Sequence, residues 1–260
     1  MLYEAFGLSY APMIATFIWS VVICLIGYFA VFKLRLFDVL LKQPLATPFM
    51  GIPALMFGFL MVFMASAAWQ NISLARTALV NEHAAVARMA AVPIEPAAQK
   101  QKLRAGIRRY LAAVLDDEWS RLHNEERSTD AEAALAGLEA DIWAIDTLCR
   151  GKTEACSSGQ ATSTFLKALD DLRLAREERL SLAFQGRMRL KWALAISLAI
   201  VTSLAIAAVH RATPRAAMLG VGLFGLAIWM SFSVVTLNIQ PYRGPDALSP
   251  AMLKAMHAKL

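Results

Sequence analysis

Histidine is scarce in this sequence, and the common catalytic motifs are missing. The 260 residues include four histidines, and no two of them stand at the spacing of metal ligands. A glycine-rich phosphate loop and a Gly-x-Ser-x-Gly motif are both absent. The sequence therefore predicts no catalytic, metal or cofactor site, and we expect a protein that is not an enzyme.

Charge is missing from the central parts of four long apolar stretches, which lie at Tyr10–Phe32, Phe49–Ala68, Trp192–Val209 and Ala216–Leu237. Each stretch is near the length of about 20 apolar residues that crosses the hydrocarbon core of a bilayer. Proton relays and ion-coupled transporters place ionisable side chains inside their spans, so this absence disfavours active transport. A passive pore needs no such groups, because apolar rings and hydroxyl groups can line it.

Most acidic residues lie between the second and third stretches, in a segment long enough for one small domain. Its apolar residues recur at steps of three and four, which is helical spacing. We therefore predict an all-α membrane protein with four transmembrane helices and a helical extramembrane head between the second and third. The expected parts are transmembrane helices 1 and 2 in residues 1–68, the head in 69–191, helices 3 and 4 in 192–239, and a tail in 240–260.

The second apolar stretch passes into the head without a break signal. No Gly or Pro occurs between Phe59 and Val92, so one helix is expected to run from the membrane into the head. The run from Thr162 to Val209 is expected to return in the same way, with only Gly186 weakening it. These two runs predict stalks that carry a helical hairpin.

Two polar patterns concern the hairpin itself. Thr129 to Glu132 has the sequence of a capping box and predicts the start of a helix at Thr129. An acidic cluster could attract a cation, but its spacing differs from that of hard-cation loops, and we interpret it as a solvated helix face. The cluster consists of Asp116, Asp117, Glu118, Glu125 and Glu126.

The short loops between spans carry basic residues, which are Lys33, Arg35 and Lys42 in the first and Arg211 and Arg215 in the second. The positive-inside rule then places both loops in the cytoplasm and the head outside, in the periplasm. Basic residues just before the third span argue the other way, but long domains weigh less in this rule.

Two of the three cysteines, Cys149 and Cys156, flank a turn-rich segment that can bring them together. A disulfide between them requires an oxidising compartment, which agrees with an external head. The alternative is a pair of unpaired thiols in a reducing cytoplasm.

Small residues on two spans predict close helix packing, because they let backbones approach in a membrane. They are Ala54 and Gly58 on the second span and Ala195, Ala199 and Ser203 on the third.

The second span also offers candidates for the lining of a pore, with an aromatic constriction and polar contacts for an ion at its mouth. These candidates are Phe57, Ser66, Trp69, Gln70 and Asn71, with Phe57 as the constriction and Asn71 or Gln70 as the polar contact. The alternative is that the aromatic residues face lipid or anchor the interface.

Three short motifs, in this order along the chain, resemble those of the bacterial bestrophin-like family, formerly called DUF4239. They are Arg108-Arg109-Tyr110, Asp117-Glu118-Trp119, and Pro241-Tyr-Arg-Gly244 followed by Ser249-Pro250. The resemblance covers nearly the whole chain. It implies a multi-pass protein of the bacterial inner membrane with distant similarity to the pentameric bestrophin anion channels.

Two functions follow from these observations. The first is an oligomeric, bestrophin-like anion channel whose partners are the lipid bilayer, other copies of the chain and inorganic anions. The second is a non-conducting membrane-anchored protein that senses or binds a partner through its helical head. A nucleic acid is not an expected partner, because the net charge of +6 comes mainly from basic residues beside the spans.

Overall fold

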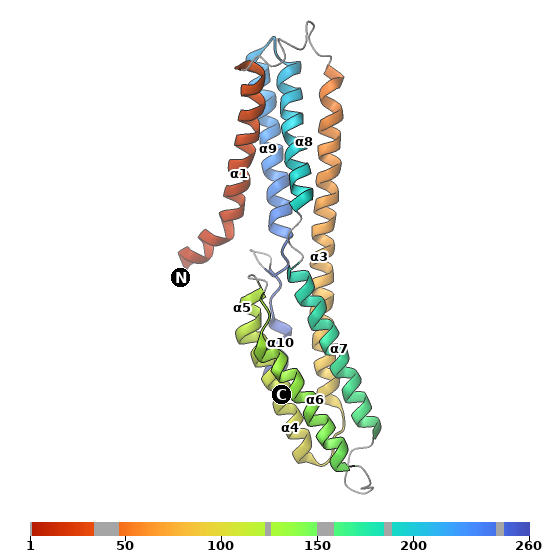
Figure 1. Cartoon of the computed structure of the whole chain (residues 1–260). Helices are drawn as coiled ribbons and strands as arrows, with labels where there is room; N and C mark the ends of the chain where they lie inside the picture. Colours follow the sequence, from red (N-terminus) through yellow and green to blue (C-terminus); the bar gives the residue numbers. More distant parts are fainter. Residues whose placement is uncertain (1, 34–46, 123–125, 150–158, 185–188, 243–246) are drawn as a thin grey trace. The chain divides into compact units, whose positions relative to one another are not determined.

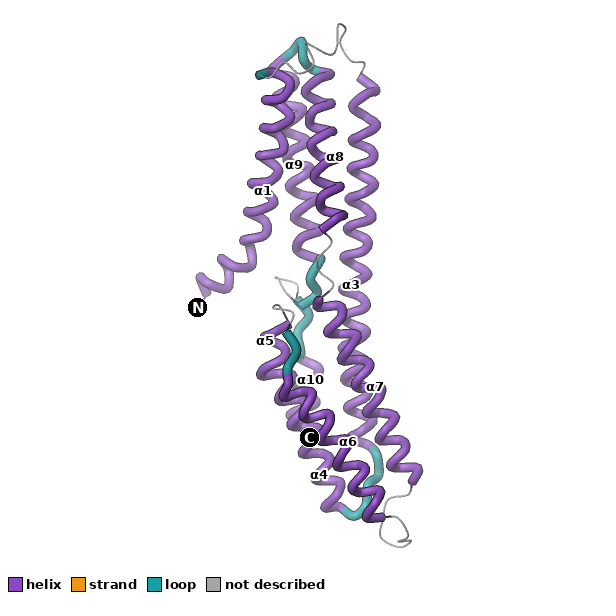
Figure 2. The backbone as a smooth tube through the Cα atoms, viewed as in Figure 1, coloured by secondary structure: helices purple, strands orange, loops and turns teal. Residues whose placement is uncertain are grey.

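The computed structural model describes residues 2–33, 47–122, 126–149, 159–184, 189–242 and 247–260. Every regular element in these ranges is a helix, as Figure 2 shows, so the predicted all-α class is confirmed. The elements are α1 (Leu2–Phe32), η1 (Thr47–Met50), α3 (Gly51–Ala91), α4 (Ala97–Ala113), the π-helix η2 (Val114–Glu118), α5 (Trp119–Arg121), α6 (Thr129–Cys149), α7 (Gly159–Phe184), α8 (Arg189–Val209), α9 (Pro214–Asn238) and α10 (Ala251–Lys259).

Four segments of the described chain contain helix that is long and apolar enough to cross a membrane. They are Ala11–Phe32, Pro48–Ala91, Gly159–Val209 and Pro214–Asn238, in agreement with the four predicted spans. The helix α3 is unbroken from Gly51 to Ala91, which includes the stretch after Phe59 where the lack of Gly and Pro predicts a continuous helix. The helices α7 and α8 are separated by residues 185–188, which lie outside the described residues.

The chain divides into two compact units (Figure 1). The membrane unit contains α1, α8, α9 and α3 up to Asn71. The head unit contains the rest of α3, the helices from α4 to α7, Pro241–Tyr242 and α10. Pro241, Tyr242 and α10, which follow the fourth span, therefore pack as part of the head.

In the membrane unit, α1 packs against α8 and α9 through small residues. Ala195, Ala199 and Ser203 on α8 are fully buried. A side chain at Gly27 of α1 would collide with Ser203, so this glycine is required for the close approach of the two helices. The hydroxyl groups of Thr16 and Ser233 form a hydrogen bond of 3.0 Å between α1 and α9.

The head unit has its own apolar core, formed by α3, α4, α6 and α7. Leu103, Ile107 and Leu111 of α4 are buried in it, as the helical spacing of the sequence indicates. Leu253 of α10 is also fully buried in this core. The C-terminal helix is thus an integral part of the head.

The start of α6 differs from the predicted capping box by one residue. The hydroxyl of Ser128, not that of Thr129, accepts a hydrogen bond of 3.3 Å from the amide of Ala131. With Ser128 as the cap, the box position three residues later is Ala131, so Glu132 cannot complete a box. The carboxylate of Glu132 lies 3.8 Å from Arg176 Nη2 instead.

Candidate functional site

One face of α3 within the membrane unit is left open by the rest of the described chain. Phe59 and Phe63 are 58% and 71% exposed, Ser66 is half-buried and Gln70 is exposed. These positions are spaced by four, three and four residues, so they follow one side of the helix. Along this open face of α3, the side chains change from aromatic rings to a hydroxyl and an amide.

The other residues that the sequence singles out on α3 lie in varied surroundings. Phe57 is buried, with its ring centroid 5.5 Å from that of Phe224 and 6.2 Å from that of Phe232. Trp69 is exposed, while Asn71 and Ala54 are half-buried. Gly58 is also exposed, and a side chain there would meet no described atom within 4 Å. In a single chain, Phe57 therefore packs inside the membrane unit rather than on the open face.

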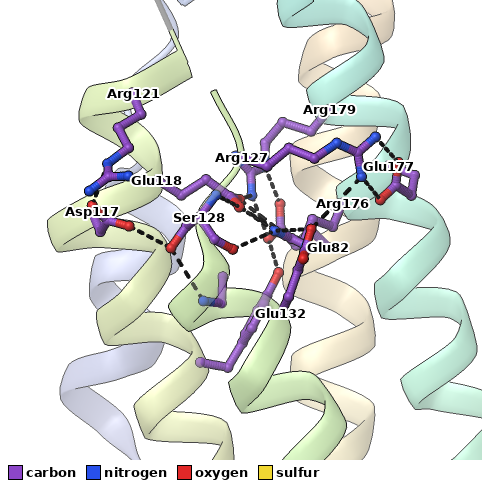
Figure 3. A network of polar contacts seen from close by, with 12 residues as sticks. Glu82, Asp117, Glu118, Arg121, Arg127, Ser128, Glu132, Arg176, Glu177 and Arg179 are labelled. Atoms are coloured by element: carbon purple, nitrogen blue, oxygen red, sulfur yellow. Dashed lines mark hydrogen bonds and ion pairs between the residues drawn. The ribbon is translucent and has the colours of Figure 1, made fainter. Parts of the chain in front are cut away.

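A cluster of buried charges occupies the interior of the head (Figure 3). It consists of Glu82 on α3, Glu118 at the end of η2, and Arg176 and Arg179 on α7, and we call it the ionic cluster. All four residues are at most 3% exposed. The two carboxylates and two guanidinium groups have opposite charges that cancel, and buried charges are tolerated only when they are paired in this way.

Arg179 joins the two acids of the ionic cluster. Its Nε donates a hydrogen bond of 2.7 Å to Glu82 Oε2, and its Nη2 donates one of 2.5 Å to Glu118 Oε1. Arg176 donates from Nη2 to the other oxygen of Glu118 at 2.5 Å. The four charges thus form a chain that ties α3, η2 and α7 together.

Neighbouring groups complete the hydrogen bonds of the acids. The hydroxyl of Tyr110 donates to Glu82 Oε1 at 2.6 Å, and the amide of Ser128 donates to Glu118 Oε2 at 3.4 Å. The guanidinium carbon of Arg179 lies 5.6 Å from the centroid of the Trp119 ring, which is cation–π geometry. Arg179 Nη1 has no hydrogen-bond partner among the described atoms.

The surroundings of Glu118, Arg176 and Arg179 favour the charged forms of these three side chains. Burial alone would raise the pKa of Glu118, but Arg176 and Arg179 outweigh burial and hold that pKa below its usual value. Burial would lower the pKa of Arg179, yet Glu82 and Glu118 raise it. Burial and the adjacent Glu82 raise the pKa of Tyr110, so its hydroxyl stays protonated and donates.

The interpretation of Glu118 as part of a solvated face is wrong, because its side chain is fully buried. The sequence did contain a signal for the ionic cluster, since its charged residues stand in phase with apolar ones. Glu118 follows the buried Tyr110 by eight residues, and Arg176 follows Leu172 by four. Opposite charges in the apolar phase of different helices indicate a buried pair.

The remaining predicted features concern metals and cysteines. The described residues contain no group of three or more His, Cys, Asp or Glu side chains that could hold a metal ion. Cys24 is a free thiol, whereas Cys149, at the end of α6, is disulfide-bonded. Cys156 lies outside the described residues, so its pairing with Cys149 stays a prediction.

Solved structures with the same fold are found among bacterial bestrophin homologues. Two crystal structures of variants of a homologue from Klebsiella pneumoniae superpose with TM-scores of 0.66 and 0.62, at 11% and 13% sequence identity. The matches cover 95% and 93% of this chain and 97% and 96% of those chains. At this level of identity they show the fold alone.

The sequence comparisons address the family directly. No match is found among curated proteins. A family model, the Bestrophin-like domain, matches residues 14–253, which is nearly the whole chain. The chain therefore belongs to the Bestrophin-like family.

Proposed function

We propose that the protein is an oligomeric anion channel of a bacterial inner membrane, in which the open face of α3 lines the conduction path. The observation that carries this proposal is the row of residues on the open face, in which Phe59, Phe63 and Gln70 are exposed and Ser66 is half-buried. A single helix cannot enclose a path, so several copies of the chain would have to contribute this face. The small residues Ala54 and Gly58 would allow close contact between neighbouring copies.

The chemistry of the open face suits an anion. The rings of Phe59 and Phe63 would form apolar constrictions, which gate by excluding water. The hydroxyl of Ser66 and the amides of Gln70 and Asn71 would donate hydrogen bonds to an ion that sheds part of its hydration. No carboxylate lies in the central part of any span to repel an anion. Family membership supports the same reading, since the resemblance implies similarity to anion channels.

Two of the five pore candidates, Phe57 and Trp69, are given roles other than lining the open face. Because Phe57 is buried against Phe224 and Phe232, we assign the constriction to Phe59 and Phe63 instead. Phe57 would reach the path only if α3 rotated in the assembly. The exposed Trp69 stands at the polar end of the open face, at the level where tryptophan anchors a helix to the interface.

Chloride efflux from liposomes that contain the purified protein tests this function. Wild-type protein should release chloride and should behave as an oligomer in detergent. Phe63→Ala should increase efflux severalfold, because it widens an apolar constriction. Leu223→Ala, at a position on α9 that is equally exposed at 70%, should leave efflux unchanged. A monomer without efflux, or equal effects of the two substitutions, would contradict the proposal.

The head is proposed to lie in the periplasm, from the basic residues of the two short loops. A topology reporter fused at Gly159, the first residue of α7, tests this orientation. Reporter activity specific to the periplasm supports it and also the predicted disulfide. A cytoplasmic signal would contradict the proposed orientation.

A second candidate function is capture of a partner by the head. Arg104, Arg108 and Arg109 are exposed on α4, which favours an acidic partner. Here chloride efflux would be absent, and Arg104→Glu with Arg108→Glu would abolish cross-linking of the wild-type protein to one other protein in intact membranes. Efflux from liposomes that contain the chain alone would exclude this candidate as the main activity.

A further inference from the structure

A groove lies between α1 and α9 on the membrane unit, away from the residues of the proposed pore. Its volume is about 560 Å³, which is within the usual range for a ligand pocket. Large apolar side chains form most of its lining, among them Phe17, Phe29, Met218, Leu226 and Trp229. A groove of this size and composition fits an apolar ligand.

Three of the four polar side chains that line the groove already donate hydrogen bonds within the protein. The Ser20 hydroxyl donates to the Phe17 carbonyl at 2.8 Å, and the Cys24 thiol donates to the Val221 carbonyl at 3.3 Å. The indole of Trp229 donates to the carbonyl of Met13 at 3.2 Å. With these three donors occupied, only Tyr28 is left to offset the desolvation of a polar ligand, so the groove favours an apolar one.

Gly222 keeps the groove open. A side chain built on this glycine would meet no described atom within 4 Å, so the backbone does not need a glycine for packing. By contrast, a side chain at Gly225 would approach the sulfur of Cys24 to 2.5 Å, which closes the floor of the groove. The open space at Gly222 is therefore a feature that a larger residue would fill.

The groove runs along the helix axes. Phe17 marks one end, where its ring packs edge-on against Trp229 with centroids 5.8 Å apart. Phe29 and Met218 mark the other end. The step from Phe17 to Phe29 corresponds to about 18 Å of helix. That length is more than half of a hydrocarbon core of about 30 Å, so the groove follows the direction of a lipid acyl chain.

Two basic residues stand beyond the Phe29 and Met218 end. Lys33 follows Phe29 by four residues, and Arg215 precedes Met218 by three, so both lie on the groove side of their helices. Both are exposed, and neither forms an ion pair with another described residue. Tyr28, the remaining polar residue of the lining, is near the same end. A positive edge thus adjoins an apolar groove.

We propose that this groove binds an anionic phospholipid, with one acyl chain between α1 and α9 and the phosphate held by Lys33 and Arg215. Basic residues at the end of a cleft between transmembrane helices are the usual means of holding an anionic headgroup. A phospholipid supplies both the apolar chain and the negative charge that the two parts of the site require. A helix of a second copy is the competing occupant, and it matches only the apolar part.

Lipid exchange into nanodiscs tests the proposal. Purified protein is placed in nanodiscs of equal phosphatidylglycerol and phosphatidylcholine with identical acyl chains, and the lipids retained after release are counted by native mass spectrometry. Wild-type protein should retain phosphatidylglycerol over phosphatidylcholine by on the order of tenfold. Lys33→Gln with Arg215→Gln should abolish this preference. Gly222→Leu should abolish retention of both lipids.

Matched controls separate this site from general effects. Arg189→Gln with Lys191→Gln removes two exposed charges at the start of α8 and should keep the preference. Leu223→Phe enlarges a neighbouring exposed residue outside the groove and should keep retention. Because Lys33 and Arg215 are exposed, their replacement tests the site even if Gly222→Leu misfolds.

Three results would overturn the proposal. The first is equal retention of the two lipids by wild-type protein. The second is unchanged retention in a folded Gly222→Leu variant. The third is an unchanged preference for phosphatidylglycerol in the variant with Lys33→Gln and Arg215→Gln. Loss of the oligomer together with the second result would assign the groove to a second copy. Since none of these outcomes depends on chloride efflux, the lipid site and the channel function fail separately.

Discussion

The two units of this chain hold their helices together by different means. In the membrane unit, Gly27 of α1 meets Ser203 of α8, and Ala195 and Ala199 are fully buried. In the head, the centre contains four buried charges, and all of the buried charged residues of the described chain are there. Lipid provides no hydrophobic drive between helices, so the membrane unit depends on close contact of small residues. Water drives apolar burial in the head, and its charges are tolerated because each is paired.

Loss of one member of the ionic cluster should have the largest effect on stability. Arg179→Leu leaves Glu82 and Glu118 buried with one partner fewer, and we expect a loss of about 3–5 kcal/mol in the free energy of unfolding of the head. Chemical denaturation measures it, followed by the fluorescence of Trp119 in a background in which the other five tryptophans are replaced by phenylalanine. Arg173→Leu, at a solvent-exposed pair with Glu139, should cost far less, because exposed ion pairs contribute little to stability. Equal costs would mean that the charges of the cluster are not tightly packed.

In the membrane unit, an added methyl group at a close helix contact should lower the stability, as the loss of a buried charge does in the head. Gly27→Ala forces Ser203 and its helix to shift, and we expect a cost of about 1–3 kcal/mol from overpacking. Thermal unfolding in detergent measures the change. Gly222→Ala, which adds the same group to open space, is the control and should not lower stability. If both substitutions behave alike, close packing at Gly27 is not what holds α1 to α8.

Acid should weaken the head through Glu118. The folded-state pKa of Glu118 is lowered, while its unfolded-state pKa is about 4.3. Its contribution to stability is therefore fully present above about pH 4.3 and is lost as the pH falls through the folded-state value. Denaturation midpoints of wild type should be steady from pH 7 to 5 and fall below pH 4.

Two variants isolate this contribution from general acid effects. Glu118→Gln should start from a lower stability and lose less of it below pH 4, because it has no proton to bind at that position. Asp116→Asn removes a nearby exposed carboxyl and should follow the wild-type curve. A fall of the same size in all three proteins would remove Glu118 as its cause.

The helix cap should give the smallest effect. Ser128→Ala removes the hydroxyl that accepts from the amide of Ala131 and donates to Asp117 Oδ2, and we expect a loss of about 1–2 kcal/mol. Thr129→Ala should change the free energy of unfolding by less than about 0.5 kcal/mol, since surface substitutions rarely do more. Denaturation of both variants under one condition compares them directly. A larger loss in Thr129→Ala than in Ser128→Ala would instead support Thr129 as the cap, as the predicted capping box has it.

The number of spans and the continuity of α3 could be predicted from the sequence, because apolar length and the lack of Gly and Pro depend on local residues alone. The ionic cluster could not, since Glu82, Glu118 and Arg179 are 36 and 61 residues apart along the chain and meet only after the helices pack. The π-helix that ends at Glu118 also has no reliable sequence signal. For Phe57, the sequence places an aromatic ring on the second span, but the direction in which the ring faces depends on its contacts with α9.

The most direct test of the central claim asks whether water reaches the open face of α3. Phe63→Cys and Leu223→Cys, both in a Cys24→Ala background, are reconstituted in liposomes, and a charged, membrane-impermeant thiol reagent is added on both sides. If α3 lines the path, the reagent should block chloride efflux through Phe63→Cys and leave efflux through Leu223→Cys unchanged. Efflux through Phe63→Cys that the reagent does not affect, with wild-type oligomeric state, would contradict the account.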